Sequence, residues 1–468
     1  MPNTMELKGK RVLVVGLART GVATARFCAA RGAVVTATDS RSENELSSTT
    51  APLRAAGVVC EFGSPTDALF LSQDLIVPSP GVPADLPQLL AARAAGVTVW
   101  SEVELAARFL RGKLIAITGS NGKTTTTSLI GHILCGAGFP TILAGNIGTP
   151  LIACVDNSRD DTVTVAELSS FQLELTESVR PNIAVFLNLT PDHLDRHHTL
   201  EAYGAVKAKI FANQTERDAA ILNADDALTT PHAPSRPQVY WFSRKQRVAQ
   251  GAFVKDGQII FRRDGEEQPI LRLEEVPLVG AHNLENVLAS VAAAKLAGAS
   301  APQIAGAIKG FSGVEHRLEF VAEVAGVRYY NDSKATNVDA TQKALEAFPG
   351  QVLVILGGKD KASDYTALRQ NLKTRAKLAL LIGSAAGKIA GQIEGSVPIE
   401  AAGTLERALQ IAERVAQPGD VVLLAPACAS FDQFENYEHR GRVFKELVHK
   451  LAQRAANLDG AVATQTGK

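Results

Sequence analysis

The chain has 468 residues, which is too long for one hydrophobic core and predicts roughly three domains. Its composition is typical of a globular protein, with 46% hydrophobic and 21% charged residues. Lys plus Arg and Asp plus Glu both number 48, so the zero net charge gives no support for binding nucleic acid or a membrane surface.

The spacing of the cysteines and the lengths of the apolar runs bear on the cellular compartment of the protein. The five cysteines are scattered and form no Cys-x-x-Cys motif, so we expect no disulfide framework and no zinc site. The apolar run after Lys10 and Arg11 is too short for a signal peptide. No run approaches the ~18 apolar residues of a membrane span. We therefore expect a cytoplasmic protein without a membrane span.

The first unit begins with a strand–turn–helix–strand pattern over residues 10–39. Gly16 and Gly21 stand at the turn, and Asp39 ends the second strand, as in a βαβ nucleotide-binding unit. The next apolar run ends in a turn that begins at Ser79. Because ligands of parallel sheets bind beyond the carboxyl ends of the strands, these turns are candidate binding segments.

The second unit opens with the segment LIAITGSNGKTTTTSLI, residues 114–130. The apolar residues predict a buried strand, the glycines a loop, and the threonines the start of a helix. A complete phosphate loop reads GxxxxGK[ST], and Ile117 stands at its first glycine position, so the match is partial. Gly119 and Gly122 still allow backbone N–H groups to converge on phosphate oxygens at a helix N-terminus.

The two residues after these glycines complete the phosphate chemistry. Lys123 would neutralise phosphate charge, and the Thr124 hydroxyl would bind Mg²⁺. The alternative interpretation is a tight strand-to-helix turn with an exposed lysine.

Candidate metal ligands follow the next two predicted strands, over 162–168 and 182–189. Glu167 ends the first of these strands, where a carboxylate can hold Mg²⁺, although an acid there can equally cap a helix. His193 lies just beyond the second strand, and a single histidine near a turn is more often structural than a ligand.

A predicted helix over 200–211 contains a lysine in an unusual position. Leu200, Tyr203, Lys207 and Phe211 fall on one face, so Lys207 interrupts an apolar stripe while Lys209 points elsewhere. One interpretation is a lysine whose stem packs while its ammonium reaches water. The other is a lysine that acts at the metal end of the site.

The remaining pattern predicts antiparallel strands over 253–273, an amphipathic helix over 281–299, and a third unit from about residue 314. Strands at 327–330, 352–356, 378–382 and 421–425 alternate with helices in that unit. The segment after about residue 457 has no clear pattern, and we expect it to be frayed. The overall prediction is an α/β protein with three consecutive α/β domains.

Several motifs occur in the order found in the Mur ligases, so the chain is identified as resembling that family. They are TGSNGKTTT, ELSSFQLE, NLTPDHLDRH, YGAVKAKIF, GAHNLENVLA, EHRLEF, NDSKATN and LGGKDKASD. The segment PACASFDQFENYEHRGRVF resembles most closely the members that add D-glutamate to UDP-N-acetylmuramoyl-L-alanine in peptidoglycan precursor synthesis. The resemblance covers about Gly9 to Leu451, and the partial phosphate loop is itself the family's form.

The resemblance implies Rossmann-like first and third domains around a central P-loop NTPase-like domain. The expected boundaries are 1–106 for the UDP-substrate domain, 107–313 for the ATP-binding domain and 314–468 for the acceptor domain. It also implies a monomer that makes an amide bond through an acyl phosphate, with ATP, two Mg²⁺ ions and a carbamylated Lys207.

The resemblance assigns residues to four sites. The implied ATP contacts are Gly119, Ser120, Asn121, Gly122, Lys123, Thr124, Thr125, Asn283 and Arg317, with Asp332 and Lys334 approaching from the third domain. The implied Mg²⁺ ligands are Thr124 and Glu167 for one ion and His193 with Lys207 for the second, and Lys123, Glu167, His193 and Lys207 are the implied catalytic residues.

The two organic substrates have their own implied residues. UDP-N-acetylmuramoyl-L-alanine would contact Thr20, Ser40, Arg41, Ser79, Gly81, Asn146 and Gln172. D-glutamate would contact Thr336, Lys361, Ser430 and Tyr437, the last of which is often Phe in the family. The first turn departs from the family pattern, because Ala18 and Arg19 replace a glycine and an aliphatic residue.

Other function classes fit the sequence less well. A Mur ligase with another acceptor, or a folylpolyglutamate synthase, is the nearest alternative, but the DNPR-type signature of the diamino-acid enzymes is absent and PACASFDQF disfavours the others. An NAD-binding redox protein would need GxGxxG at Gly16. A non-catalytic nucleotide switch would have no use for Glu167, His193 and Lys207 together.

Overall fold

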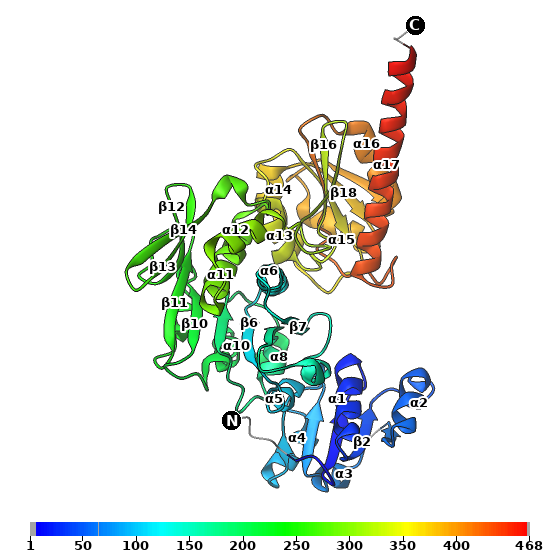
Figure 1. The fold of residues 1–468 in the computed structure, drawn as a ribbon. Helices are drawn as coiled ribbons and strands as arrows, with labels where there is room; N and C mark the ends of the chain where they lie inside the picture. The colour runs from blue at the N-terminus through cyan, green and yellow to red at the C-terminus, as the bar shows by residue number, and fades with distance from the viewer. Residues whose placement is uncertain (1–5, 64, 466–468) are drawn as a thin grey trace. The chain divides into compact units, whose positions relative to one another are not determined.

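The computed structural model describes residues 6–63 and 65–465, and within them the strands form three sheets (Figure 1). The chain divides into two compact units, one of residues up to 276 together with 285–310, the other of residues 277–284 together with 311 onward. The first unit contains the first two sheets and the second contains the third. The α/β fold class is confirmed, while the three domain boundaries remain a prediction.

The first sheet is wholly parallel because each strand returns through a helix or a crossover loop. Its strand order is β3-β2-β1-β4-β5, with β1 Arg11–Val15, β2 Val34–Asp39, β3 Val59–Phe62, β4 Leu75–Pro78 and β5 Thr98–Val99. Its helices are α1 Arg19–Ala30, α2 Ser47–Ala55, α3 Asp67–Leu71 and α4 Pro87–Ala94. The strand order reverses between β1 and β4, which is the place where open α/β sheets bind ligands.

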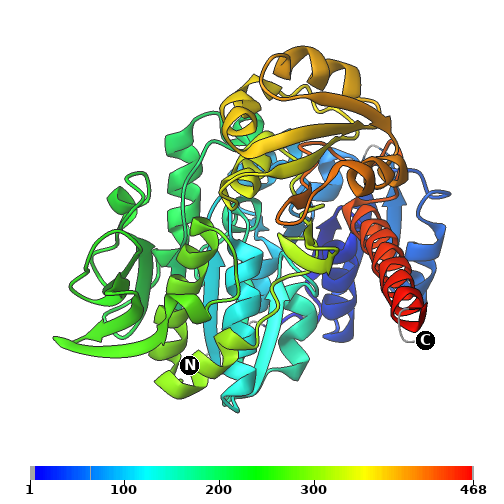
Figure 2. The same cartoon turned by 90° about the horizontal axis from the view of Figure 1, so that it is seen from above.

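The central sheet combines a parallel part with an antiparallel extension (Figure 2). Its order is β14-β13-β12-β11-β10-β9-β6-β8-β7, with β6 Lys113–Thr118, β7 Thr141–Gly145, β8 Val163–Glu167, β9 Ile183–Phe186, β10 Ala219–Asn223, β11 Gln238–Ser243, β12 Gly251–Lys255, β13 Gln258–Arg263 and β14 Glu266–Arg272. The strands β12 to β14 are antiparallel to one another, as predicted from the turns in 253–273.

Helices surround this central sheet within the first unit. They are α5 Glu102–Ala107, α6 Lys123–Gly136, α7 Leu151–Cys154, α8 Ser170–Leu173, α9 Leu194–His197, α10 Leu200–Ala208 and α12 Ala301–Lys309, with α11 Ala281–Ala297 running from the second unit into the first. The helix predicted over 200–211 is shorter than expected, because the backbone tightens into a 3₁₀ turn over Lys209–Phe211.

The third sheet has the order β15-β16-β20-β17-β18-β19 and is parallel except for β15. The strands are β15 Glu319–Val324, β16 Val327–Asn331, β17 Val352–Gly357, β18 Ala376–Ile382, β19 Ile399–Gly403 and β20 Val421–Leu424. The helices are α13 Val338–Glu346, α14 Arg369–Arg375, α15 Ala386–Ile393, α16 Leu405–Val415 and α17 Tyr437–Gln465.

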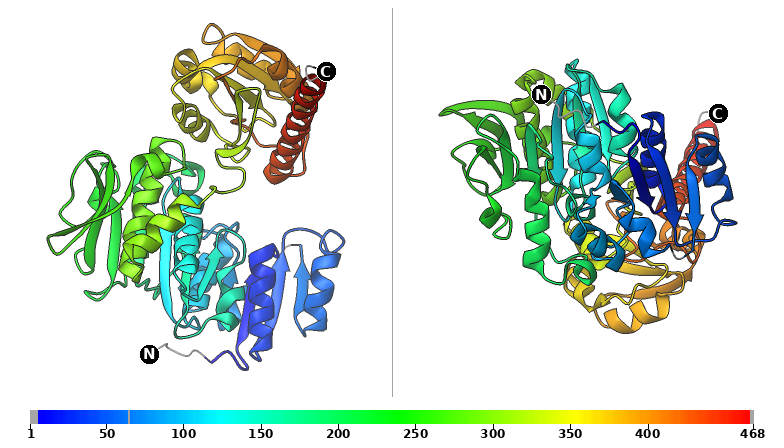
Figure 3. Two further views of the ribbon diagram at one scale, coloured as in Figure 1. Left: turned by 45° about the horizontal axis from the view of Figure 1, so that its top comes forward. Right: turned by 90° about the horizontal axis from the view of Figure 1, so that it is seen from below.

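The last helix differs from the expectation of a frayed end. Helix α17 packs against β15, β16 and α16 and continues to Gln465 (Figure 3). The alanines of this segment favour helix once the preceding turns have nucleated it. No helix in the described part of the chain is long and apolar enough to cross a membrane.

Candidate functional site

The phosphate-loop segment lies at the carboxyl end of β6 and leads directly into α6. Gly122 is the N-cap of α6 and has a left-handed backbone with φ of 81°. A Cβ atom at Gly122 would collide with the Asn286 side chain of α11, so both backbone and space require glycine. The N-terminus of α6 therefore lies at the loop, where the N–H groups of a first helical turn can bind an anion.

A second loop holds the phosphate loop in shape. The Asn188 side chain accepts a hydrogen bond from the Asn121 N–H at 2.9 Å and donates one to the Asn121 carbonyl at 3.1 Å. The Ser120 hydroxyl donates to the Thr190 carbonyl and accepts from the Thr190 N–H. Asn188 and Thr190 were not among the predicted site residues, because only tertiary contact shows that their loop follows a strand adjacent to β6.

Lys123 lies over the phosphate loop itself. Its ammonium donates to the carbonyls of Gly119 and Ser120, both at 2.8 Å. The Lys123 side chain is only partly exposed and folds onto its own loop, so the alternative of a solvent-exposed lysine is wrong.

Glu167 and Thr124 meet at the end of β8, which neighbours β6 in the sheet. The Thr124 hydroxyl donates to Glu167 Oε2 at 2.8 Å, and Asn146 Nδ2 donates to Oε1 at 2.8 Å. Glu167 is buried and caps no helix, which excludes that alternative. The Thr124 hydroxyl and the Glu167 carboxylate therefore form a pair of hard oxygen donors at the phosphate loop.

This donor pair fits the coordination habits of Mg²⁺. The described residues contain no group of three or more His, Cys, Asp or Glu side chains placed to hold a metal ion. Mg²⁺ commonly binds through one or two carboxylates together with substrate phosphates and water, rather than in a cage made only of protein ligands. The residues present thus fit a magnesium ion that binds together with a nucleotide.

Lys207 is fully buried and does not reach solvent. Its exposed fraction is 1%, and its ammonium donates to the Gly119 carbonyl at 2.8 Å. The ammonium also lies 4.4 Å from the centroid of the Tyr203 ring. Burial, and then the nearby Lys123 ammonium, hold the pKa of Lys207 well below its ordinary value. The interpretation of a packed stem with a solvated ammonium is therefore wrong.

His193 is an exposed residue with a left-handed backbone, φ 53°, at the start of α9. Its ring centroid lies 4.9 Å from that of Phe171 and 6.3 Å from that of Tyr203, the ring that Lys207 also contacts. The structure thus brings His193 and Lys207 to the same aromatic side chain. A non-glycine residue in this conformation is uncommon and occurs mainly where surrounding contacts or function require it.

A second histidine of the same segment was missed from the sequence. His197 is buried, with Nε2 3.0 Å from Ser170 Oγ and its ring 5.0 Å from that of Tyr203. Burial lowers the pKa of His197 despite the Glu174 carboxylate nearby. The neutral ring is therefore favoured, and it packs against Phe171 and Tyr203, the two rings that His193 also contacts. The motif NLTPDHLDRHH contains it, but does not distinguish a packing histidine from a ligand.

A cavity of about 510 Å³ lies at the carboxyl ends of β1, β2 and β4. Five residues that the resemblance assigns to the UDP substrate line it together: Thr20, Ser40, Arg41, Ser79 and Gly81. The Ser79 hydroxyl donates to the Gly16 carbonyl at 2.7 Å and so closes the turn over the cavity. The cavity is lined partly by apolar side chains, as a nucleoside requires.

The Asp39 carboxylate forms its hydrogen bonds with groups of the protein itself. It accepts from the Leu17 N–H at 2.6 Å and from the Arg41 guanidinium at 2.9 and 3.0 Å. These bonds hold the pKa of Asp39 well below its usual range. In dinucleotide-binding folds the acid at this place receives the ribose hydroxyls, so this arrangement disfavours the NAD-binding alternative.

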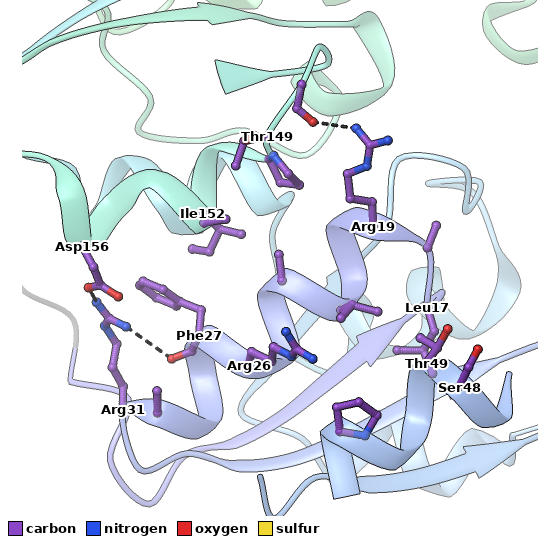
Figure 4. Close-up of a pocket in the computed structure, with 18 residues that line it drawn as sticks. Leu17, Arg19, Arg26, Phe27, Arg31, Ser48, Thr49, Thr149, Ile152 and Asp156 are labelled. Carbon is purple, nitrogen blue, oxygen red and sulfur yellow. Dashed lines mark hydrogen bonds and ion pairs between the residues drawn. The ribbon is translucent and has the colours of Figure 1, made fainter. Parts of the chain in front are cut away.

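Arg19, at the departure from the family pattern, points away from this cavity. Its guanidinium donates to the Gly148 carbonyl at 2.6 Å, in the loop between β7 and α7 (Figure 4). It lines a separate cavity of about 750 Å³ next to α1, together with Arg26 and Arg31. Arg19 therefore links the first sheet's Gly-turn to the loop that begins at Asn146.

The last two residues assigned to the UDP substrate, Asn146 and Gln172, do not line the cavity of about 510 Å³. Asn146 is bonded to Glu167, as described above. Gln172 is buried and caps α8, with its side-chain oxygen accepting from the Ser169 N–H at 3.0 Å. The capping role explains the SSFQ sequence without a ligand, and the substrate contact of Gln172 stays a prediction.

Four predicted nucleotide contacts belong to the second unit. They are Asn283, Arg317, Asp332 and Lys334. Asp332 follows β16 and is buried, which raises the pKa of its carboxyl to about 7 against the opposing effect of Arg317. The Lys334 ammonium lies 5.0 Å from the centroid of the Tyr437 ring. Asp332 therefore interacts electrostatically with Arg317, and Lys334 lies beside the Tyr437 ring.

The predicted acceptor residues come from three neighbouring strand ends. Thr336 follows β16, Ser430 follows β20 and Lys361 follows β17, while Tyr437 begins α17. Backbone hydrogen bonds join these segments, from Ala427 N–H to the Ala335 carbonyl and from Lys359 N–H to the Ala429 carbonyl. Because β16, β20 and β17 are adjacent, these residues share one edge of the sheet.

Comparison with known families gives three matches in chain order. Residues 10–101 match the Mur ligase MurD-like N-terminal domain, residues 117–294 the Mur ligase middle domain, and residues 316–428 the Mur ligase glutamate ligase domain.

Two relatives are both named UDP-N-acetylmuramoylalanine--D-glutamate ligase. The protein from Acidobacterium capsulatum is 58% identical over 97% of this chain and 98% of its own length. The protein from Koribacter versatilis is 54% identical over 96% of this chain and 99% of its own length.

Solved structures with low identity share the fold. MurF ligase from Thermotoga maritima in complex with ADP has a TM-score of 0.59 at 16% identity, covering 96% of this chain and 97% of that one. UDP-N-acetylmuramate-alanine ligase from the same organism has a TM-score of 0.57 at 19% identity, covering 94% and 99%. Since the domains match in order and relatives more than half identical span nearly the whole length, the chain belongs to the Mur ligase family.

Proposed function

We propose that this protein is an ATP-dependent ligase that joins D-glutamate to UDP-N-acetylmuramoyl-L-alanine, a step of peptidoglycan precursor synthesis. The observation that carries the proposal is the phosphate loop with Thr124 hydrogen-bonded to Glu167 and Lys207 buried against Gly119. A phosphate loop alone would suit any nucleotide-binding protein. A metal-binding acid and a buried lysine beside it suit a phosphoryl transfer.

The chemistry explains why ATP is needed. A carboxylate is a poor acyl donor because its leaving group would be oxide. The alanyl carboxylate therefore attacks the γ-phosphorus of ATP, forming an acyl phosphate and releasing ADP. The D-glutamate amine then attacks the acyl carbon, and the C–O bond to phosphate breaks as the amine loses a proton. The products are the amide, ADP and inorganic phosphate.

The residues at β6 and β8 would assist the first step. Lys123, held over the loop by the carbonyls of Gly119 and Ser120, would place its ammonium against the transferring phosphate. Thr124 and Glu167 would hold Mg²⁺, which when bound offsets the repulsion between the anionic carboxylate and the phosphates. The N–H groups at the start of α6 would bind phosphate oxygens.

A second Mg²⁺ and a carbamylated Lys207 are a finer part of the proposal. An ammonium near a bound cation would be repelled, and Lys207 is already destabilised as a cation by burial and Lys123. The neutral amine can attack CO₂, forming an N–C bond and losing one proton, which yields an anionic carbamate with oxygen donors. His193 and this carbamate, which both lie near the Tyr203 ring, would be the ligands of the second ion.

The carbamate has a readout that does not depend on activity. Protein equilibrated with ¹³C-bicarbonate should show a carbamate carbon signal by NMR, which disappears in Lys207→Ala and persists in Lys209→Ala. Absence of the signal in the wild-type protein would rule out the modification under those conditions of pH and bicarbonate, and with it the second-ion assignment.

The acceptor is tested by measuring ADP release. The reaction contains UDP-N-acetylmuramoyl-L-alanine, ATP and Mg²⁺, with D-glutamate, L-glutamate, L-alanine or meso-diaminopimelate as candidate acceptors. D-glutamate should support the fastest turnover by a large margin, because Lys361, Thr336 and Ser430 would bind its side-chain carboxylate. Faster turnover with any other amino acid would overturn the acceptor assignment, and Lys361→Ala should raise KM for D-glutamate without raising KM for ATP.

We further propose that the ligase works in the cytoplasm as a monomer, where its nucleotide substrates are made. Light scattering on the purified protein should give a mass near 49.5 kDa, the mass of one chain. A dimer mass at micromolar concentration would contradict the monomer.

A further inference from the structure

Arg440, in the first turn of α17, is a fully buried cation that the proposed chemistry does not use. Its exposed fraction is 0%, and it is the largest of the fully buried side chains in the described part of the chain. None of the ion pairs formed by the described residues involves Arg440, and the Asp432 carboxylate acts on its pKa only from a greater distance. Burying an arginine without a paired acid is costly, so its hydrogen bonds need an explanation.

The guanidinium binds segments that follow two different strands. Nε donates to the Ser333 hydroxyl at 3.0 Å and Nη2 to the Ser333 carbonyl at 2.8 Å, beyond β16. Nη2 also donates to the Cys428 carbonyl at 3.2 Å and Nη1 to the Ala429 carbonyl at 3.4 Å, beyond β20. One side chain therefore holds both segments at a fixed separation.

Two further contacts extend this network to the remaining parts of the acceptor site. The Ser333 hydroxyl donates to the Tyr437 carbonyl at 2.8 Å, which ties in the start of α17. The Ala429 carbonyl also accepts from the Lys359 N–H at 2.8 Å, on the segment that leads to Lys361. A Cβ atom at Gly358 would collide with the Ala429 carbonyl and press on the guanidinium, so this segment packs directly on Arg440.

Each predicted acceptor residue is thus close in sequence to a group in this network. Thr336 follows Ser333 by three residues, Ser430 follows Ala429, and Lys361 follows Lys359 by two residues. Tyr437 itself accepts the hydrogen bond from Ser333. The guanidinium itself is sealed from solvent and cannot touch a bound amino acid. Burial lowers its pKa only to about 10, so it remains a cation with all five N–H donors at neutral pH.

We propose that Arg440 is a positioning residue for the amino-acid acceptor, holding the segments after β16, β17 and β20 and the start of α17 in the arrangement that binds D-glutamate. The inference rests on the proposed function, because it assumes that these segments form the acceptor site. The planar guanidinium suits this task because its donors point in fixed directions toward several carbonyls.

Arg440→Lys in the full-length protein is the main test. A lysine ammonium keeps the charge but cannot span carbonyls on both segments, so the acceptor residues lose their spacing. KM for D-glutamate should rise about tenfold or more, while KM for UDP-N-acetylmuramoyl-L-alanine, whose predicted contacts all belong to the first unit, changes by less than about twofold. An unchanged KM for D-glutamate in folded Arg440→Lys would overturn the proposal.

Phe444→Leu is the matched control on the same helix. Phe444 is also fully buried in the described structure and packs in the core between α17 and the third sheet. Its replacement should lower the melting temperature yet leave KM for D-glutamate unchanged. A similar rise in that KM for both variants would mean that Arg440 acts only through general stability, and would also overturn the proposal.

Ser333→Ala provides a second test if Arg440→Lys does not fold. It removes the hydroxyl that joins Arg440 to Tyr437 and leaves the carbonyl bonds intact, so a smaller rise, roughly two- to fivefold, is expected in the same KM. No rise would contradict the network. If the wild-type protein prefers another amino acid, the proposed function fails, and the same comparison with that amino acid still tests Arg440.

Discussion

Lys207 in α10 and Lys209 in the 3₁₀ turn after it allow a paired test of what a single lysine contributes to catalysis. Lys207 donates to the Gly119 carbonyl of the phosphate loop, whereas Lys209 donates to the Glu174 carbonyl at 2.6 Å. Lys207→Ala should lower kcat on the order of 10²–10³-fold, because an electrostatic group at the reacting phosphate is lost. Acetate at high concentration should restore part of the rate by supplying the missing oxygen ligand.

Lys209→Ala serves as the control and should keep near wild-type kcat with no effect of acetate. Both variants need a melting curve, since each removes a partly or fully buried hydrogen bond. Full activity of a well-folded Lys207→Ala would remove this lysine from the catalytic site.

Lys123 offers a second prediction for a single side chain. Lys123→Ala removes the ammonium that lies over the phosphate loop, so the charge developing on the transferring phosphate loses its neighbouring cation. Steady-state ADP release should fall on the order of 10²–10³-fold. Lys113→Ala, at the exposed start of β6, should have no comparable effect, and equal turnover by both variants would argue against the phosphate-loop assignment.

At the scale of elements, the two ends of helix α6 should respond oppositely to the same substitution. Gly122→Ala places a methyl group on a left-handed residue and against Asn286, so it should destabilise the protein by roughly 1 kcal/mol or more and weaken ATP binding. Gly136→Ala, in the last turn of the helix, meets no atom within 4 Å and should stabilise it by about 0.4–1 kcal/mol.

Melting temperatures of the two variants, with and without ATP and Mg²⁺, check this prediction. The addition of nucleotide should raise the melting temperature of Gly136→Ala as much as that of the wild type, and that of Gly122→Ala less. If both substitutions had the same sign, the left-handed conformation at Gly122 would not be the reason for its glycine.

At the scale of the whole molecule, a buried carboxyl group links helix α5 to helix α7. Glu102 in α5 accepts from the Ile152 N–H of α7 at 2.6 Å, and burial raises the pKa of its carboxyl from 4.5 to about 7. Between pH 4.5 and about pH 7, the Glu102 carboxyl is deprotonated in the unfolded chain but still protonated in the folded protein. Stability therefore decreases as pH rises through this window, by roughly 3 kcal/mol in the limit.

Glu102→Gln removes that dependence while keeping an acceptor for the Ile152 N–H. The melting temperature of the variant relative to the wild type should increase from about pH 4.5 to about pH 7 and then level off. Thermal melts in matched buffers measure this difference. A difference that did not change with pH would show that Glu102 is already ionised in the folded protein.

The sequence by itself determined the features that depend on neighbouring residues. The strand and helix periodicities, the glycine turn at Gly16 and the phosphate loop at Gly122 are local, because backbone conformation and amphipathic pattern are set within a few residues. The motif order likewise identified the family. The pattern after Thr199 correctly predicts a helix but places its end too late. The α-helix ends at Ala208, where a 3₁₀ turn begins, and this end depends on tertiary packing.

Only the tertiary structure decided which distant groups meet. Lys207 lies 88 residues from Gly119, and Arg440 lies 107 residues from Ser333, so no local pattern could distinguish a buried functional lysine from a solvated one or find the arginine at all. Strand order brings β8 and β9 to either side of β6 and so places Glu167 and the Asn188 loop beside the phosphate loop. The physical reason is that burial and hydrogen bonding of a charge depend on what packs around it, and those neighbours come from segments far apart in the chain.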